Sequence, residues 1–298
     1  MFSILVPTWN NLEYLQLCVA GIRKHTSVPH EILVHVNEGT DGTREWLQSQ
    51  GIRYTSSERN LGVCMSLNEL AMHATQPWIA YLNDDMYCCP GWDTAFARAI
   101  AQAPTDLALY SSRLIEPFPS KVPFIDCFDA GRTPTDFDEE ALLRAVAGLP
   151  SADVDGEGSQ PTVVSRLWWH RLGGYGIEYS PGMSSDDDFL LKMWAVGCRR
   201  FKVVGDSHVY HFSQRSTGRI RKNKGGHTLL LKWGLTSKHF RAERKRLLAE
   251  GAGAGAGILE PSLANRLRRA WLAATSRYPL LDTDRFAQSL SSKREGDD

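Results

Sequence analysis

The sequence predicts an α/β protein whose mainly parallel central sheet is flanked by helices. Over the first hundred residues, short apolar and β-branched runs alternate with segments whose apolar residues recur every three or four positions. Strands separated by helices of this length need crossover connections, which make neighbouring strands parallel. Polar residues directly follow several of these strands, at the sheet edge where open α/β proteins bind ligands.

Each element follows from its local pattern. Phe2–Pro7 is a short apolar run stopped by proline, which predicts a buried strand. A helix is expected from about Asn11, because Leu12, Leu15 and Val19 share one helical face. The same reasoning predicts strands at Glu31–Val36, Ile52–Thr55 and Trp78–Leu82, and helices at Thr43–Gln50, Val63–Ala74 and from about Pro90.

Composition narrows the class of protein. The six cysteines form no C-x-x-C pair, so we expect neither a zinc site nor a disulfide framework, and a cytoplasmic location follows. The sequence has no apolar stretch long enough to cross a bilayer, and its start lacks the basic region of a signal peptide. Residues 212–298 hold 18 Lys and Arg against 8 Asp and Glu, although the whole chain has no net charge. This basic third favours an anionic partner, and nucleic acid is not expected because no recognition motif is present.

The strand at Trp78–Leu82 runs directly into Asn83, Asp84 and Asp85. Paired carboxylates at the carboxyl edge of a sheet suit Mg²⁺ or Mn²⁺, which commonly hold a diphosphate. The structural alternative is a polar turn that caps the next helix. Neither G-x-G-x-x-G nor a P-loop follows the first strand, so a base or ribose, rather than a phosphate, is expected beside that strand's end.

Five segments in order resemble the motifs of inverting family 2 glycosyltransferases with the GT-A fold. They are Val6-Pro7-Thr8-Trp9-Asn10, Asn37-Glu38-Gly39-Thr40-Asp41-Gly42-Thr43, Arg59-Asn60-Leu61-Gly62, Leu82-Asn83-Asp84-Asp85 and Ser185-Asp186-Asp187-Asp188-Phe189. The resemblance covers roughly residues 2–215. It implies a nucleotide-diphosphate sugar donor of the UDP, dTDP or GDP type, a Mn²⁺ or Mg²⁺ ion, and transfer with inversion.

The resemblance also implies roles for individual residues in the first half. The donor contacts would be Pro7, Thr8, Asn10, Glu38, Arg59, Asn60, Asn83 and Asp84. Asp85 would be the direct metal ligand. Glu38 stands where the family usually has Asp, in a segment one residue shorter than usual, so the base stays open. For Glu38 and Arg59 the structural alternative is a surface charge at a strand end.

In the second half, the resemblance makes Asp186 the general base that deprotonates the acceptor hydroxyl. Asp188 is the alternative base, or else ties the helix to the neighbouring loop. Ser185 replaces the family's usual Glu, and the three acids could also cap a helix. His211 would complete the metal site, with His208 as the second choice and a structural histidine as the alternative to both.

These interpretations give an expected organisation of the chain. A GT-A-like catalytic domain is expected at 1–212, with a nucleotide-binding half to about 110 and an acceptor and base half from about 111. It is followed by a basic loop and helix at 213–250, a Gly/Ala linker at 251–257, and an amphipathic extension at 258–298. The basic loop is predicted to be a lid over the diphosphate or a solvated loop. The acceptor pocket is predicted to lie between a loop-rich insertion at 116–160, with one helix near Asp138–Ala147, and the pair Trp168-Trp169. The extension could dock on the body, form a dimer contact or rest on an anionic membrane.

The predicted function is therefore metal-dependent, inverting sugar transfer to a glycan, lipid-linked or protein acceptor, in the cytoplasm or at the inner face of the membrane. A nucleotide- or glycan-binding module without catalysis is one alternative. A glycoside hydrolase with paired carboxylates is another, and it would need neither a nucleotide pocket nor a metal motif.

Overall fold

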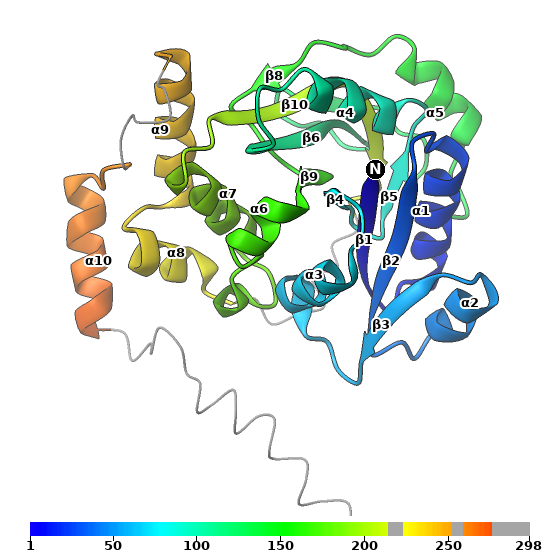
Figure 1. The fold of residues 1–298 in the computed structure, drawn as a ribbon, viewed down its shortest axis with the longest axis horizontal. Coiled ribbons are helices and arrows are strands. Elements are labelled where there is room, and N and C mark those ends of the chain that lie inside the picture. Colours follow the sequence, from blue (N-terminus) through cyan, green and yellow to red (C-terminus); the bar gives the residue numbers. More distant parts are fainter. Residues whose placement is uncertain (214–222, 252–258, 276–298) are drawn as a thin grey trace, which may run out of the picture.

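The computed structural model describes residues 1–213, 223–251 and 259–275, and it contains a central mixed sheet with helices on both faces (Figure 1). The strand order is β3-β2-β1-β4-β9-β6-β10-β5, with β7 paired to β6 and β8 paired to β10. The strands are β1 (Phe2–Trp9), β2 (His30–Asn37), β3 (Arg53–Ser57), β4 (Trp78–Tyr81), β5 (Met86–Cys88), β6 (Ala108–Glu116), β7 (Ile125–Cys127), β8 (Val154–Asp155), β9 (Thr162–Ser165) and β10 (Arg200–His211).

The first four strands in the sheet are parallel, as the sequence predicts. Strand β1 pairs in parallel with β2 on one side and β4 on the other, so their carboxyl ends lie at one edge. Strand β9 is antiparallel to both β4 and β6, and β5 is antiparallel to β10. The sheet is therefore parallel in its first half and mixed in its second half.

The helices predicted from about Asn11, at Thr43–Gln50, Val63–Ala74, from about Pro90 and near Asp138–Ala147 lie close to those limits. The helices are α1 (Leu12–His25), α2 (Thr43–Ser49), α3 (Gly62–His73), α4 (Trp92–Ala101), α5 (Glu139–Val146), α6 (Arg166–Arg171), α7 (Ser185–Ala195), α8 (Gly225–Trp233), α9 (Ser237–Ala249) and α10 (Leu263–Thr275), with a 3₁₀ turn at Ile177–Tyr179. The predicted helix in the insertion is confirmed as α5, whose first turn is capped by Asp138.

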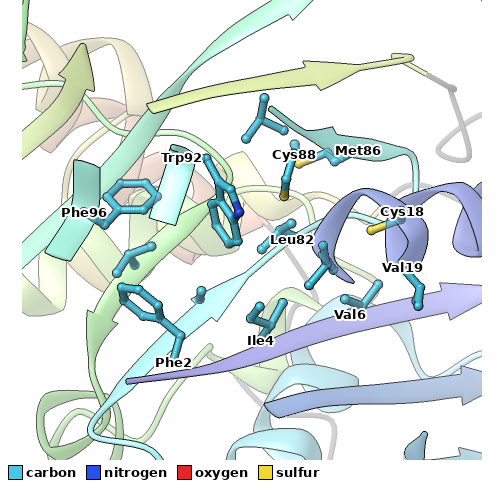
Figure 2. Packing of buried hydrophobic residues seen from close by; sticks show 14 of the residues in the cluster. Phe2, Ile4, Val6, Cys18, Val19, Leu82, Met86, Cys88, Trp92 and Phe96 are labelled. Carbon is cyan, nitrogen blue, oxygen red and sulfur yellow. The ribbon is translucent and has the colours of Figure 1, made fainter. Parts of the chain in front are cut away.

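Alternate side chains of β1 enter the two cores on opposite faces of the sheet. Phe2, Ile4 and Val6 pack with α1 and α4 on one face, as Figure 2 shows, whereas Leu5 packs against α3 on the other. This is the period of two that a pleated strand imposes. Burial on both faces explains why the β1 sequence is almost continuously apolar.

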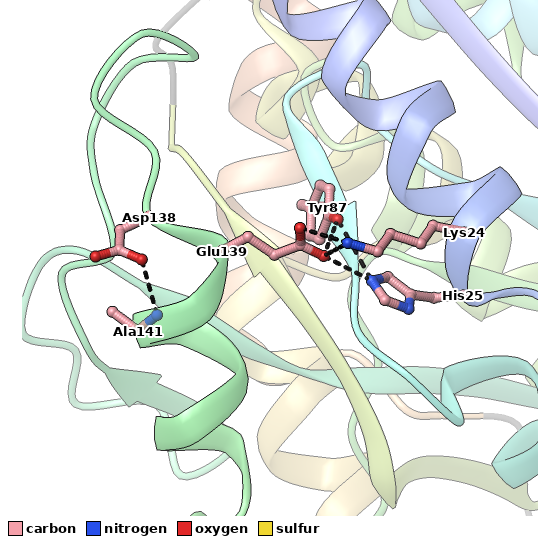
Figure 3. A network of polar contacts seen from close by, with 6 residues as sticks. All are labelled: Lys24, His25, Tyr87, Asp138, Glu139 and Ala141. Carbon is pink, nitrogen blue, oxygen red and sulfur yellow. Dashed lines mark hydrogen bonds and ion pairs between the residues drawn. The ribbon is translucent and has the colours of Figure 1, made fainter.

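The insertion is fixed to the body through Glu139 at the start of α5 (Figure 3). Its carboxylate accepts hydrogen bonds from Lys24 at 2.7 Å and from Tyr87 at 2.7 Å, and it lies 3.0 Å from His25 Nε2. Burial alone would raise the pKa of Glu139, but these three partners lower it to about 2. The carboxylate is therefore ionised at neutral pH and joins α5 to α1 and β5.

The C-terminal helix α10 packs on α8, beyond the edge of the sheet (Figure 1). Leu272 is buried, whereas Leu263 and Leu267 on the same helix are exposed. Of the three arrangements considered for the extension, the structure shows α10 docked on the body. Within the described ranges, no helix is long and apolar enough to span a bilayer. Most of the predicted lid and linker, at 214–222 and 252–258, lies outside the described residues.

Candidate active site

A cavity of about 360 Å³ lies where the strand ends of the parallel half meet the start of α7. Its wall comes from segments that are far apart in the sequence but end at one edge of the sheet, as the sequence analysis predicts. The lining residues are Pro7, Thr8, Trp9, Asn37, Asn60, Gly62, Val63, Tyr81, Asn83, Asp84, Asp85, Gln160, Pro181, Gly182, Met183, Ser185, Asp186 and His211. Seven of the ten donor and metal residues predicted from sequence are in this wall.

The turn between β4 and β5 presents two carboxylates with different partners. Asp84 accepts a hydrogen bond from Thr8 Oγ1 at 2.7 Å, which connects the ends of β1 and β4. Asp85 is 4% exposed, and its Oδ1 lies 3.4 Å from His211 Nε2. Backbone pairing fixes this geometry, because Phe212 N donates to the carbonyl of Asp85 at 3.0 Å. The capping alternative for this turn is not observed, since helix α4 begins only at Trp92.

Glu116, at the end of β6, holds the other side of the His211 ring. Its carboxylate lies 2.8 Å from Nδ1, so the imidazole is between two carboxylates. Burial alone would lower the pKa of His211, but Asp85 and Glu116 raise it to about 10. His208, the second choice, lies 3.2 Å from the Pro150 carbonyl and is not part of the cavity wall.

Asn37 organises the floor of the cavity, and the sequence analysis did not assign it to the site. Its side chain is 3% exposed, and its Nδ2 donates to the carbonyl of Thr8 and to Ser66 Oγ. Its Oδ1 accepts from Leu61 N at 2.8 Å. Asn37 thus joins the ends of β1 and β2 to the start of α3. Its place as the last residue of a buried strand was the available signal.

Three of the predicted donor residues lie outside the wall of the cavity. Glu38 accepts hydrogen bonds from Trp9 Nε1 at 2.8 Å and from Asn10 Nδ2 at 3.2 Å, while Asn10 Oδ1 accepts from Thr40 N. These contacts hold together the loops that follow β1 and β2. Arg59 is exposed beside the entrance to α3. The structure therefore gives Glu38 and Asn10 a loop-bracing position and does not bring Arg59 into the wall.

The three consecutive carboxylates of α7 diverge, because successive helical residues point about 100° apart. Asp187 is held by Arg241 Nε at 3.1 Å, and Asp188 by Lys232 at 2.8 Å and Trp233 Nε1 at 2.7 Å. Only Asp186 lines the cavity. Capping therefore does not explain the three acids.

Asp186 is exposed to the solvent of the cavity but is fixed by two neighbours. Its Oδ1 accepts from Tyr175 OH at 2.7 Å and its Oδ2 from Gln160 Nε2 at 3.0 Å. Desolvation by the surrounding protein raises the pKa of this carboxyl above its ordinary value, although both hydrogen bonds lower it. The result is an oriented carboxylate with raised basicity at the mouth of the cavity.

Comparison with known proteins agrees with this geometry. Residues 3–134 match the model of glycosyl transferase family 2. The structure of residues 1–349 of S. aureus TarS is similar with a TM-score of 0.57, at 14% identity over 92% of this chain and 78% of that one. The structure described as the mannosyltransferase PcManGT from Pyrobaculum calidifontis in complex with GDP-Man and Mn²⁺ has a TM-score of 0.52, at 16% identity over 99% of this chain and 81% of that one.

This chain has the GT-A fold of family 2 glycosyltransferases. The resemblance drawn from the five sequence motifs is thereby confirmed. The same S. aureus TarS fragment has been solved in complex with UDP-GlcNAc, with a TM-score of 0.56 at 13% identity over 90% of this chain and 78% of that one. A search by sequence among curated proteins finds no match.

The structure gives Asp188 and Ser185 structural contacts. Asp188, the alternative base, is fully buried and carries ion pairs to Lys192 and Lys232, so it cannot reach a substrate. It ties α7 to α8, which is the structural role considered for it. Ser185, at the family's Glu position, donates to the carbonyl of Gly182 at 2.7 Å and stabilises the turn before α7.

The residues at Asp85 fit the divalent cation that the family implies. Across the described part of the chain, no group of three or more His, Cys, Asp or Glu forms a complete metal cage. A Mg²⁺ or Mn²⁺ ion that also binds a diphosphate needs fewer protein ligands, since phosphate oxygens and waters supply the rest. Asp85 and His211 face each other across 3.4 Å in the cavity wall, and Glu116 orients the ring as outer carboxylates orient metal-bound histidines.

A second cavity of about 530 Å³ adjoins the first. The two cavities share Gln160 and Asp186, and Tyr175 lines the second. Its outer wall comes from the insertion, at 121–125, and from α9. The predicted pair Trp168-Trp169 is not part of it, because Trp169 is buried against Tyr175 and Phe189, and Trp168 bonds to Asp106.

Proposed function

We propose that this protein transfers a sugar, with inversion, from a nucleoside-diphosphate donor to an acceptor hydroxyl. The observation that carries the proposal is the convergence of Asp85, His211 and Asp186 in one cavity of a family 2 fold. A divalent cation held by Asp85 and His211 would supply positive charge for the leaving diphosphate. Deprotonation of the acceptor hydroxyl depends on residues of the chain itself.

In the proposed reaction, Asp186 takes the proton of the acceptor hydroxyl as that oxygen bonds to the anomeric carbon. The bond between the anomeric carbon and the diphosphate oxygen breaks at the same time. Attack from the face opposite the leaving group inverts the configuration. Tyr175 and Gln160 hold the carboxylate in place, so it needs no rotation when the acceptor arrives.

No observation favours the two alternative functions. A paired-carboxylate hydrolase would use a second acid near Asp186. Asp187 pairs with Arg241, and the other two acids of the cavity are bonded at the strand ends, Asp84 to Thr8 and Asp85 to His211. The sequence feature that favours a module without catalysis is Ser185 in place of the family's usual Glu. The acid that faces the cavity is the next residue, Asp186.

The proposal predicts that one of UDP, GDP, dTDP and CDP raises the melting temperature in the presence of Mn²⁺. A nucleotide at 100 times its Kd should add about 2.7 kcal/mol to the free energy of unfolding. Product stereochemistry with the matching nucleotide sugar then tests inversion by NMR. Absence of stabilisation by all four nucleotides, with and without Mn²⁺, would contradict the proposal.

We also propose that α10 rests on an anionic membrane surface. Leu263, Leu267 and Trp271 are spaced four apart and are 73%, 64% and 63% exposed, so they form an apolar stripe on one side of the helix. The helix carries three arginines and no acidic residue. Basic helices with exposed Leu and Trp lie in the interface of anionic bilayers. A cytoplasmic location stays a prediction.

Wild-type protein is expected to sediment with phosphatidylglycerol vesicles at low salt, and much less with phosphatidylcholine vesicles. The double substitution L267E and W271E should abolish sedimentation, because it places two anions in the stripe. Met72 on α3 is 75% exposed, so M72E is the matched control and should sediment like wild type. Failure of the wild type to sediment with anionic vesicles removes the proposal.

A further inference from the structure

The second cavity leads to the same carboxylate as the first. Its inner end is formed by Gln160, Tyr175 and Asp186, and both Gln160 and Tyr175 hydrogen-bond to Asp186. A molecule in this cavity is therefore in contact with the residues that hold Asp186 and can reach Asp186 itself. If Asp186 is the general base, as proposed above, this cavity is the place for the acceptor.

Four cationic side chains line this cavity. Lys121 comes from the insertion, and Arg241, Arg244 and Lys245 come from α9, where their spacing puts them on one face of the helix. The acidic lining residues other than Asp186 are Glu157 and Asp187. Asp187 is neutralised by Arg241, and Glu157 lies 3.9 Å from both Arg244 and Lys245. With Asp186 included, four cations face three carboxylates, which leaves a surplus of one positive charge around the cavity.

Arg244 is an unusual member of this wall, because its guanidinium is buried without a full set of partners. It is 1% exposed and packs between the rings of Phe201 and Phe240. Its Nε donates to the Gly156 carbonyl at 3.1 Å, but Nη1 has no hydrogen-bond partner among the described residues. Burial lowers the pKa of Arg244 to about 10, so it remains charged at neutral pH. A buried, incompletely bonded guanidinium is the group that an oxyanion would satisfy.

The remaining wall is apolar. The insertion side is lined by apolar residues, whereas the α9 side is cationic. The apolar residues are Val122, Pro123, Phe124 and Ile125. A volume of about 530 Å³ lies within the range of small-molecule sites, which is larger than one sugar ring requires. The occupant therefore has a hydroxyl for Asp186, an anionic group for the α9 side and some carbon surface.

We propose that this second cavity binds an acceptor that carries an oxyanion, a phosphate or a carboxylate, next to the hydroxyl that receives the sugar. The inference rests on the proposed function, because it takes Asp186 as the base. It adds the chemical class of the acceptor and assigns its recognition to Lys121, Arg244 and Lys245. Arg241 contributes through Asp187, which it orients.

Calorimetric titration with three probes tests this assignment. Glucose 6-phosphate, glucuronate and glucose are titrated into protein saturated with Mn²⁺ and its stabilising nucleoside diphosphate, in a phosphate-free buffer. At least one of the two anions should bind about tenfold or more tightly than glucose, and its affinity should fall as salt is raised. The stronger of the two anions identifies the preferred oxyanion. Equal affinity for all three probes, or no binding of any, would overturn the proposal.

Two variants locate the binding. The double substitution K121Q and K245Q removes two exposed cations of the cavity and should weaken the preferred anion about tenfold. Arg246 is next to Lys245 on α9 but pairs with Glu243 and Glu250 outside the cavity, so R246Q is the matched control. Equal weakening by both would show a general charge effect and would contradict the assigned site.

These measurements distinguish a failure of the proposed acceptor class from a failure of the proposed transferase activity. Stabilisation by a nucleoside diphosphate with no preference for anionic probes leaves the donor function standing and removes the acceptor class alone. Anion binding that K121Q and K245Q weaken, in a protein that no nucleotide stabilises, keeps the anion site and removes the transferase. Arg244→Lys provides a further check, because it keeps the positive charge but removes the Nη1 donor. It should lower the affinity for the preferred anion.

Discussion

Asp186→Asn is expected to lower the kcat of sugar transfer by about 10²–10⁴-fold, the usual contribution of general base catalysis. The amide fills the same space and can still meet Tyr175 and Gln160, but it cannot accept the acceptor's proton. The Kd for the nucleoside diphosphate should stay unchanged, because the donor contacts lie at the strand ends. Steady-state kinetics and nucleotide titration measure the two effects separately.

Asp188→Asn is the comparison that distinguishes the two acids. Asp188 is buried and pairs with Lys192 and Lys232, so its loss should lower the melting temperature. The rate per folded molecule should be unchanged. If Asp188→Asn instead abolished transfer by folded protein while Asp186→Asn did not, the assignment of the base would be wrong.

The pH profile gives an independent test of Asp186. Its pKa is raised by the surrounding protein, so the carboxyl takes up a proton at a higher pH than an ordinary Asp. Because only the ionised form accepts a proton, kcat/KM should fall as the pH falls through this raised pKa. The acid limb should disappear in the residual activity of Asp186→Asn. A limb that persists in the variant would belong to another group.

The predictable part of this protein is the part built from local periodicity. The period of two in β1 and the helical spacing of Leu12, Leu15 and Val19 follow from which faces are buried, so the parallel half could be predicted element by element. Because parallel strands end at one edge, the polar residues at the end of β1 and after β4 also had to meet. Their convergence on Thr8 and Asp84 is the consequence.

The unpredicted part depends on contacts between distant segments. Strand β9 is only four residues long and follows an insertion, and its antiparallel place between β4 and β6 has no local signal. Glu116 ends a strand outside the five recognised segments, and Asn37 begins one of them without a role of its own in the resemblance. For the three acids of α7, helical geometry requires divergence, but only the packing of α8 and α9 decides that Asp186 is the one left in the cavity.

The second cavity was unpredictable for the same reason. Its walls come from the insertion and from α9, which are more than a hundred residues apart in the chain. Charge counting found the basic C-terminal third, and the structure shows that part of this charge, on α9, lines a cavity beside the candidate base. The charge total thus indicated that the partner is anionic, whereas the location of its binding site could be found only from the tertiary structure.

Asp85→Asn is expected to remove the part of the nucleotide's stabilising effect that depends on Mn²⁺. It should also lower kcat/KM on the order of 10³-fold, because the metal contributes several kcal/mol to the stability of the transition state. Asparagine keeps the size of the side chain but loses the charge that a hard cation prefers. Asp206 also lies on a strand that enters this edge, but it is exposed and pairs with Arg98, so Asp206→Asn is the matched control. Thermal shift with UDP, GDP, dTDP or CDP, with and without Mn²⁺, measures the effect.

Glu116→Gln extends the test to a residue that touches no substrate in the proposed reaction. Its carboxylate orients the His211 ring, and loss of such an outer partner weakens metal binding about 10–100-fold. Calorimetric titration with Mn²⁺ in the presence of nucleotide should show this loss, while kcat at saturating Mn²⁺ recovers because Asp85 and His211 are still present. Transfer that proceeds at the wild-type rate in excess EDTA would contradict the metal role. In that case His211, whose pKa Asp85 and Glu116 raise to about 10 when no metal is bound, would itself face the leaving diphosphate as the cation. His211→Gln should then lower kcat in EDTA.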